Sequence, residues 1–95
     1  MSFDERQIEH QFIQLDLTQF RIKQLANQFL FFREGYSKRL IDMWRKHFYN
    51  EDADKKLNLI YVLNEIIINS SMKNKIDYIK GFGDILKELF EEIIQ

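Results

Sequence analysis

Besides the final Ser70, four polar side chains interrupt an apolar stretch of the chain, YVLNEIIINS at residues 61–70. They are a phenol, Tyr61, a carboxylate, Glu65, and two carboxamides, Asn64 and Asn69. These groups donate and accept hydrogen bonds, but none of them is paired with a base that would activate a nucleophile. The chemistry that they suit is recognition of a ligand.

Metal chemistry is not expected from this sequence. The chain has no cysteine, which excludes disulfides and thiolate zinc sites. Its two histidines, His10 and His47, are fewer than the ligands that a zinc site needs. We therefore predict no metal and no cofactor.

Catalytic patterns are also missing. Asp77 and Asp84 lie seven residues apart and share a helix face, which is typical of a solvated surface. The GFG at residues 81–83 lacks the spacing and the lysine of a phosphate-binding loop. Ser70 and Ser71 have no base at a helical spacing that would activate them. We predict that the protein is not an enzyme.

Size and charge narrow the class of protein further. With 95 residues, 45% hydrophobic and 31% charged, residues 1–95 suit one small globular domain. The net charge of -1 provides no general basic field for nucleic acid or an anionic membrane. The chain shows neither a signal peptide nor the roughly 20 apolar residues of a membrane span. Scattered cations are interpreted as solvated helix surface: Arg21, Lys23, Lys38, Arg39, Arg45 and Lys46.

The elements that position these residues are expected to be helices, because the chain has no proline and three glycines. Thr18 and Asp52 are good N-caps, and Gly35 is a natural helix end. Short connections predict antiparallel neighbours in an all-α fold. The expected helices cover residues 3–14, 18 to about 35, 37–49, 52–71 and, after a break at 73–75, the remainder.

Apolar faces at helical spacing predict the core. Trp44 falls on such a face and is predicted to be structural. Gly81 and Gly83 mark either a break in the last helix or a close contact between helices. The expected core faces are Phe3, Ile8, Phe12 and Ile13; Ile22, Leu25, Ala26, Phe29 and Phe32; Leu40, Ile41, Trp44 and Phe48; and Tyr78, Ile79, Phe82, Ile85, Leu86, Leu89, Phe90 and Ile93.

The fourth predicted helix has two unequal faces. A wide apolar arc predicts a central helix covered by several neighbours. The narrow remaining face is called here the outer strip. It is either the floor of a groove for a partly apolar, extended ligand or a surface that the same domain covers. The arc contains Leu59, Ile60, Val62, Leu63, Ile66, Ile67 and Ser70, and the outer strip contains Leu57, Tyr61, Glu65, Ile68 and Met72.

The segment KKLNLIYVLNEIIINS, residues 55–70, resembles the fourth helix of the CTD-interacting domain (CID) family, whose usual pattern is K-L-x-x-L-Y-x-x-N-D-x-x-x-N-S. The beginning, MSFDERQIEHQFIQL, resembles the subgroup that regulates nuclear pre-mRNA. The matching residues are Lys56, Leu57, Ile60, Tyr61, Asn64, Asn69 and Ser70, supported by Leu15, Thr18, Ile22, Leu25, Trp44, Tyr78, Phe82, Leu86 and Phe90.

This resemblance implies a right-handed superhelix of antiparallel helices, related to VHS and ENTH domains. The family fold has eight helices, and the chain corresponds to the first five. The family binds the heptad-repeat C-terminal tail of RNA polymerase II, which implies a nuclear role in transcription or 3′-end RNA processing. The implied partner is therefore the phosphorylated tail peptide.

The resemblance also implies a peptide-binding site. Tyr61 would pack against the peptide, and Glu65 takes the place of an aspartate that hydrogen-bonds it. The family's phosphate-binding arginine belongs to its seventh helix, so weak or phosphate-indifferent binding is expected here. The implied peptide-binding residues are Thr18, Gln19, Ile22, Leu57, Tyr61, Asn64, Glu65 and Ile68, and the candidate phosphate contacts are Arg21, Lys23 and Lys73.

Two alternative functions remain open. A VHS/ENTH-like adaptor would need a basic lipid site or an amphipathic membrane helix, and the charge-balanced N-terminus disfavours it. A self-associating helical protein would use the wide apolar face of the last helix, residues 76–94, to form a homodimer or to exchange that helix about a hinge at 73–75.

Overall fold

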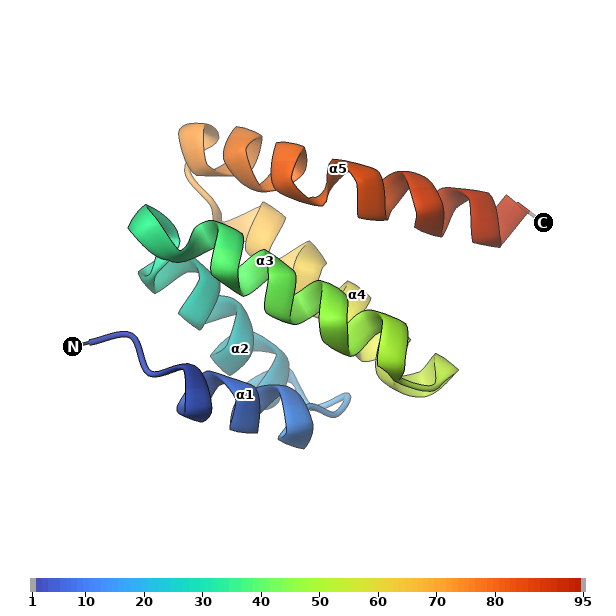
Figure 1. Ribbon diagram of the computed structural model, residues 1–95, viewed down its shortest axis with the longest axis horizontal. Helices are drawn as coiled ribbons and strands as arrows, with labels where there is room; N and C mark the ends of the chain where they lie inside the picture. The colour runs from blue at the N-terminus through green and yellow to red at the C-terminus, as the bar shows by residue number, and fades with distance from the viewer. Residues whose placement is uncertain (1, 95) are drawn as a thin grey trace.

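The computed structural model is all-α, as predicted (Figure 1). The structure describes the backbone of residues 2–94, and the side chains of that range other than those at 33, 34, 74, 84, 89, 90 and 92–94. Its helices are α1 (Glu5–Gln14), α2 (Gln19–Phe31), α3 (Arg33–Asn50), α4 (Ala53–Asn69) and α5 (Met72–Ile94).

Side-chain caps set the beginnings of three helices. The Asp4 carboxylate accepts hydrogen bonds from the backbone N–H groups of Arg6 and Gln7 at the start of α1. The Thr18 hydroxyl accepts from the Arg21 N–H at 3.4 Å, and Asp52 accepts from the Lys55 N–H at 2.9 Å. Each cap satisfies a first-turn donor that has no partner inside the helix. The predicted caps Thr18 and Asp52 are therefore confirmed.

The predicted end of the second helix at Gly35 is wrong. Helix α2 ends at Phe31, and α3 begins at Arg33, so Gly35 lies in the first turn of α3. Gly35 has φ +84°, a left-handed conformation that glycine adopts without steric cost. The glycine was therefore a correct sign of left-handed backbone, but this backbone lies just after the junction between the two helices.

The predicted break at residues 73–75 is also wrong. Helix α5 begins at Met72, and the Lys75 N–H donates to the Ser71 carbonyl at 2.8 Å. The glycines do not interrupt α5 either. A Cβ added to Gly81 would collide with the Cδ1 atom of Ile41 on α3, whereas one added to Gly83 would meet nothing within 4 Å. Gly81 thus marks a close contact between α3 and α5, the second of the two predicted alternatives.

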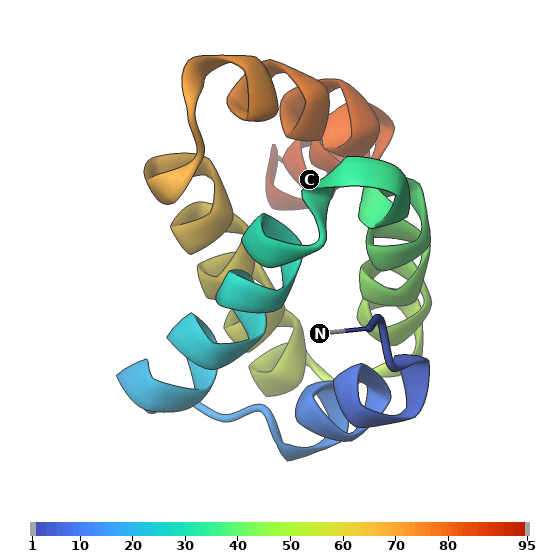
Figure 2. The same cartoon turned by 90° about the vertical axis from the view of Figure 1, so that its left-hand side faces the viewer.

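The helices stack so that each contacts the next but one along the chain as well as its neighbour in sequence. Figure 1 shows α1 at one end of the stack and α5 at the other, with α2, α3 and α4 between them. Helix α2 packs more extensively on α4 than any other pair of helices does, and the two run in the same direction (Figure 2). Helix α4 lies within the stack, since it also contacts α3 and α5.

One buried cluster draws on all five helices. Trp44 is fully buried, stacks on Phe48 and donates its indole N–H to the Leu59 carbonyl at 2.9 Å, so its predicted structural role is confirmed. At the α5 end, the buried Tyr78 donates its hydroxyl to the Phe29 carbonyl. The expected core position of Ile13 is wrong, because 61% of its surface is exposed.

We predict that the methyl group of alanine has different effects on stability at the two α5 glycines. Gly83→Ala should stabilise the fold by about 1 kcal/mol, because alanine is the better helix former and the added methyl group has open space. Gly81→Ala should gain less or lose stability, because Ile41 must move. Chemical denaturation of both variants measures the difference, and equal gains would contradict the close α3–α5 contact.

Candidate functional site

The outer strip of α4 is open to solvent. Tyr61 and Leu57 are 44% and 45% exposed, and Ile68 is 62% exposed. Met72 is 73% exposed but belongs to α5, because α4 ends at Asn69, so its predicted place on the outer strip of α4 is wrong. These values exclude the interpretation that the described part of the domain covers the strip. Apolar groups of this size, arranged in a row, suit contact with a partly apolar ligand.

The opposite face of α4 explains why this strip remains. Leu59, Val62 and Ile66 are fully buried, and Leu63 is nearly so. Because α2, α3 and α5 all pack on α4, the burial of its wide arc leaves one narrow face accessible. The two faces predicted from the sequence are therefore found in the structure.

Glu65 lies within the outer strip, and Asn69 contacts it one helical turn further on. The Asn69 amide nitrogen Nδ2 lies 2.9 Å from both the Glu65 carbonyl oxygen and the Glu65 carboxylate oxygen Oε2. Asn64 is exposed beside them. The carboxylate is thus held by its own helix and faces the surface together with Tyr61.

The second wall of the site differs from the predicted one. Ile22 is 3% exposed and belongs to the core, so its predicted contact with a ligand is wrong. It shares the inward face of α2 with Leu25, Ala26 and Phe29, which pack toward α4. Thr18 and Gln19, by contrast, are exposed at the start of α2.

Two large apolar residues near the start of α2 are exposed. Leu17 is 62% and Phe20 72% exposed. Phe20 was not predicted as a surface feature. Phe20 stands two residues before Ile22 and so lies on the other side of the helix. This spacing could have predicted its exposure.

The candidate phosphate contacts differ in how they are engaged. Arg21 donates to the Gln14 side-chain oxygen at 3.0 Å and forms an ion pair with Asp16 at 3.6 Å. Lys23 and Lys73 are exposed, on α2 and in the first turn of α5. The two lysines are thus more accessible to an external anion than Arg21.

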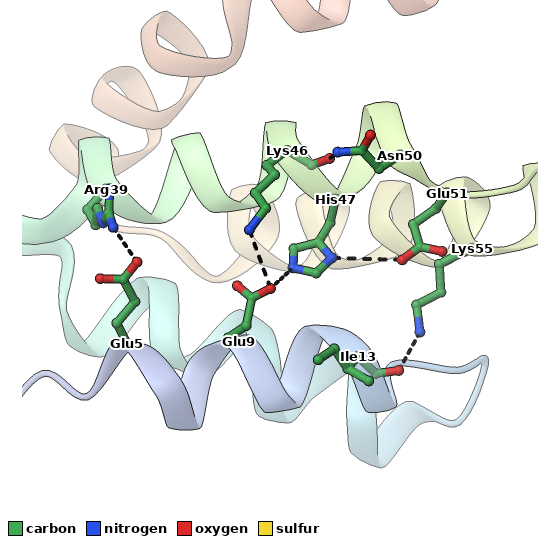
Figure 3. Close-up of polar contacts among 9 residues, drawn as sticks. All are labelled: Glu5, Glu9, Ile13, Arg39, Lys46, His47, Asn50, Glu51 and Lys55. Carbon is green, nitrogen blue, oxygen red and sulfur yellow. Dashed lines mark hydrogen bonds and ion pairs between the residues drawn. The ribbon is translucent and has the colours of Figure 1, made fainter.

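A buried histidine joins α1 to α3 (Figure 3). His47 is 8% exposed, its Nε2 lies 2.7 Å from a Glu9 carboxylate oxygen, and its ring stacks on Phe12. Its Nδ1 lies 3.8 Å from Glu51, and Lys46 lies 3.8 Å from Glu9. Sequence reasoning missed this cluster, although Glu51 stands four residues after His47. Over the described residues, no three acidic or histidine side chains gather in a way that could hold a metal.

Lys55 holds the α1–α2 turn against α4. Its Nζ donates to the carbonyl oxygens of Ile13 and Leu15 at 2.9 and 2.7 Å. These carbonyls belong to the end of α1, where acceptors lack helical partners and a cation is favoured. The contact fixes the turn that carries Thr18 and Gln19 next to the first turn of α4.

Asp16 organises that turn from within. Its Oδ1 accepts from the Thr18 N–H at 2.9 Å and from the Thr18 hydroxyl at 2.6 Å. These hydrogen bonds, aided by the charges of Arg21 and Lys55, hold the pKa of the Asp16 carboxyl below its usual value of 3.8.

A hollow of about 800 Å³ lies elsewhere, along α1 between Phe3 and Lys46. It is wide open, and its lining mixes acidic and basic side chains. The outer strip presents a row of exposed side chains along a helix, among them Leu57, Tyr61 and Ile68. A surface of this kind suits an extended peptide better than an enclosed small molecule.

Comparison with known proteins agrees with this fold. The structure defines an all-α stack of helices in which α4 presents one open strip. The CID domain family model matches residues 6–95, and the chain belongs to this family. The family is known for binding the polymerase tail and is associated with nuclear transcription and RNA processing.

One curated relative is the UPF0400 protein C337.03 of Schizosaccharomyces pombe. It is 32% identical over 65 residues, which cover 68% of this chain and 16% of the relative. The chain therefore spans about a sixth of that protein's length. No solved structure matches the chain. Within the described residues, none of the helices has the length and apolar character that crossing a membrane requires.

We predict that Asp16 contributes stability in a pH-dependent way. Its folded-state pKa is lowered, so its contribution is present above about pH 4 and is lost as the pH falls through the folded-state value. Asp16→Asn should therefore be less stable than the parent protein at pH 7, and the difference should shrink below about pH 4. Urea unfolding across this pH range measures it, and a constant difference at every pH would contradict the role of the charge.

Proposed function

We propose that this protein is a nuclear binding module for the phosphorylated heptad-repeat tail of RNA polymerase II. It would act in transcription regulation or 3′-end RNA processing, without catalytic activity of its own. The observation that carries the proposal is the exposed Tyr61 with the half-buried Glu65 one turn along α4, in a CID family member. Membership of the family supplies the class of partner.

The outer strip offers complementary contacts to an extended peptide. Tyr61 presents an aromatic ring that can pack on the peptide at low conformational cost, as aromatic anchors do at interfaces. Leu57 and Ile68 provide apolar contact on either side along the helix. Glu65 provides an acceptor, and the exposed Asn64 offers both a donor and an acceptor.

The turn at the start of α2 is the proposed second contact. Thr18 and Gln19 are exposed there, and Lys55 holds the turn against α4. For a phosphate on the peptide, the exposed Lys23 and Lys73 are the preferred partners, because Arg21 already binds Gln14 and Asp16. Isolated surface lysines give weak phosphate discrimination, so we expect a small difference between phosphorylated and unmodified peptides.

Tyr61→Ala should weaken binding of a labelled two-repeat heptad peptide by at least about tenfold, the loss typical of an interface anchor. Its stability should fall by much less than the roughly 3–5 kcal/mol of a buried aromatic, because Tyr61 is 44% exposed. Fluorescence anisotropy measures the affinity, and thermal unfolding measures the stability.

A matched control is available on α3. Tyr49 is 47% exposed, so Tyr49→Ala removes an equally accessible tyrosine away from the outer strip and should leave affinity unchanged. The fluorescence of the buried Trp44 should not respond to peptide. Equal losses at Tyr49 and Tyr61, or no binding by the parent protein, would refute the proposed site.

We also propose self-association through α5, because a second apolar row lies on its outer side. Met72, Ile76, Ile79 and Leu86 are exposed at steps of four, three and seven residues, which place them on one helix face. Phe82 is buried as expected for the core face of this helix, whereas Ile79 and Leu86, expected on the same face, are exposed. The expected members Leu89, Phe90 and Ile93 lie outside the described side chains.

A homodimer through this row should appear as a doubled mass in light scattering at micromolar concentration. Ile79→Lys should restore the monomer, because it places a charge in the middle of the apolar row. Lys80→Ala changes the neighbouring exposed residue outside the row and serves as the control. A monomer mass for the parent protein would exclude the dimer.

A further inference from the structure

Two side chains at the end of α4 donate hydrogen bonds to backbone carbonyl groups of the same helix. Asn69 donates to the Glu65 carbonyl at 2.9 Å, and the Ser70 hydroxyl donates to the Ile66 carbonyl. Both are local contacts from a side chain to the carbonyl group four residues earlier, which Ser and Asn commonly form within their own helix. On this account alone, Asn69 and Ser70 would be equivalent helix-end caps.

Asn69 differs from Ser70 in one respect. Its Nδ2 also lies 2.9 Å from the carboxylate oxygen Oε2 of Glu65. A glutamate side chain has three rotatable bonds, and a half-exposed glutamate samples several rotamers in solution. The bond from Asn69 restricts this freedom and leaves the second carboxylate oxygen able to accept from another donor.

We propose that Asn69 is a positioning residue for Glu65. By fixing one carboxylate oxygen, it directs the other toward a hydroxyl or N–H group of the peptide on the outer strip. This inference rests on the proposed function. A charged acceptor held in one arrangement binds its donor more tightly than a mobile one, because less freedom is lost on binding.

A double-mutant cycle tests the coupling. Affinity for the labelled two-repeat heptad peptide is measured for Glu65→Ala, Asn69→Ala and the double variant. We expect Asn69→Ala alone to weaken binding by about fivefold, and the double variant to bind no more weakly than Glu65→Ala. That result would mean that Asn69 acts through the carboxylate.

Ser70→Ala is the matched control for loss of a helix-end cap. It removes a carbonyl contact from the same turn without touching Glu65. Asn69→Ala and Ser70→Ala should lower the unfolding temperature to a similar extent, while Ser70→Ala leaves the affinity unchanged. A merely structural role for Asn69 would make the two variants alike in both measurements.

Three outcomes would overturn the proposal. If Asn69→Ala weakens binding equally with and without Glu65, Asn69 contacts the peptide directly; if it has no effect, Asn69 is a cap alone. If the parent protein binds no peptide, both the proposed function and the positioning role fail. The NMR shift of the Asn69 side-chain amide in free protein, compared with that in Glu65→Ala, then shows whether the contact itself exists, which separates a failed function from a failed structural contact.

Discussion

Burial of α4 is the constraint on which the rest of the structure depends. Three other helices must reach it, and the indole of Trp44 binds the Leu59 carbonyl on its α3 side. A buried donor without a partner would cost free energy, so this hydrogen bond sets the rotation of α3 against α4 as well as stabilising their contact. Once that rotation is set, the only accessible face of α4 among the described residues is the one that carries Tyr61 and Glu65.

Polar contacts, in addition to apolar packing, hold α1 against the rest of the structure. Helix α1 buries Ile8 and Phe12, and the Glu5–Arg39 ion pair, the His47–Glu9 contact and the Lys55 bonds attach it at three further points. The Lys55 bonds hold the turn before α2 next to the first turn of α4, so the two parts of the proposed site are connected through this turn.

Local patterns predicted much of this arrangement. The caps Thr18 and Asp52, the core position of Trp44 and the two faces of α4 depend on neighbouring residues and helical spacing, which the sequence contains. The errors depend on tertiary contacts. Gly35 indicates left-handed backbone, but the sequence does not show to which helix this residue belongs. Ile22 is buried because α2 packs on α4. The hydrogen-bond partner of His47 comes from another helix.

The parallel course of α2 and α4 has a consequence for how the chain folds. Contacts that hold these helices in place join residues far apart in sequence: Lys55 binds Leu15, 40 residues away, and Tyr78 binds Phe29, 49 residues away. Such contacts form only after long loops have closed, which slows folding relative to helical proteins with local contacts. During synthesis, the apolar face of α2 is therefore covered in full only after α4 has left the ribosome.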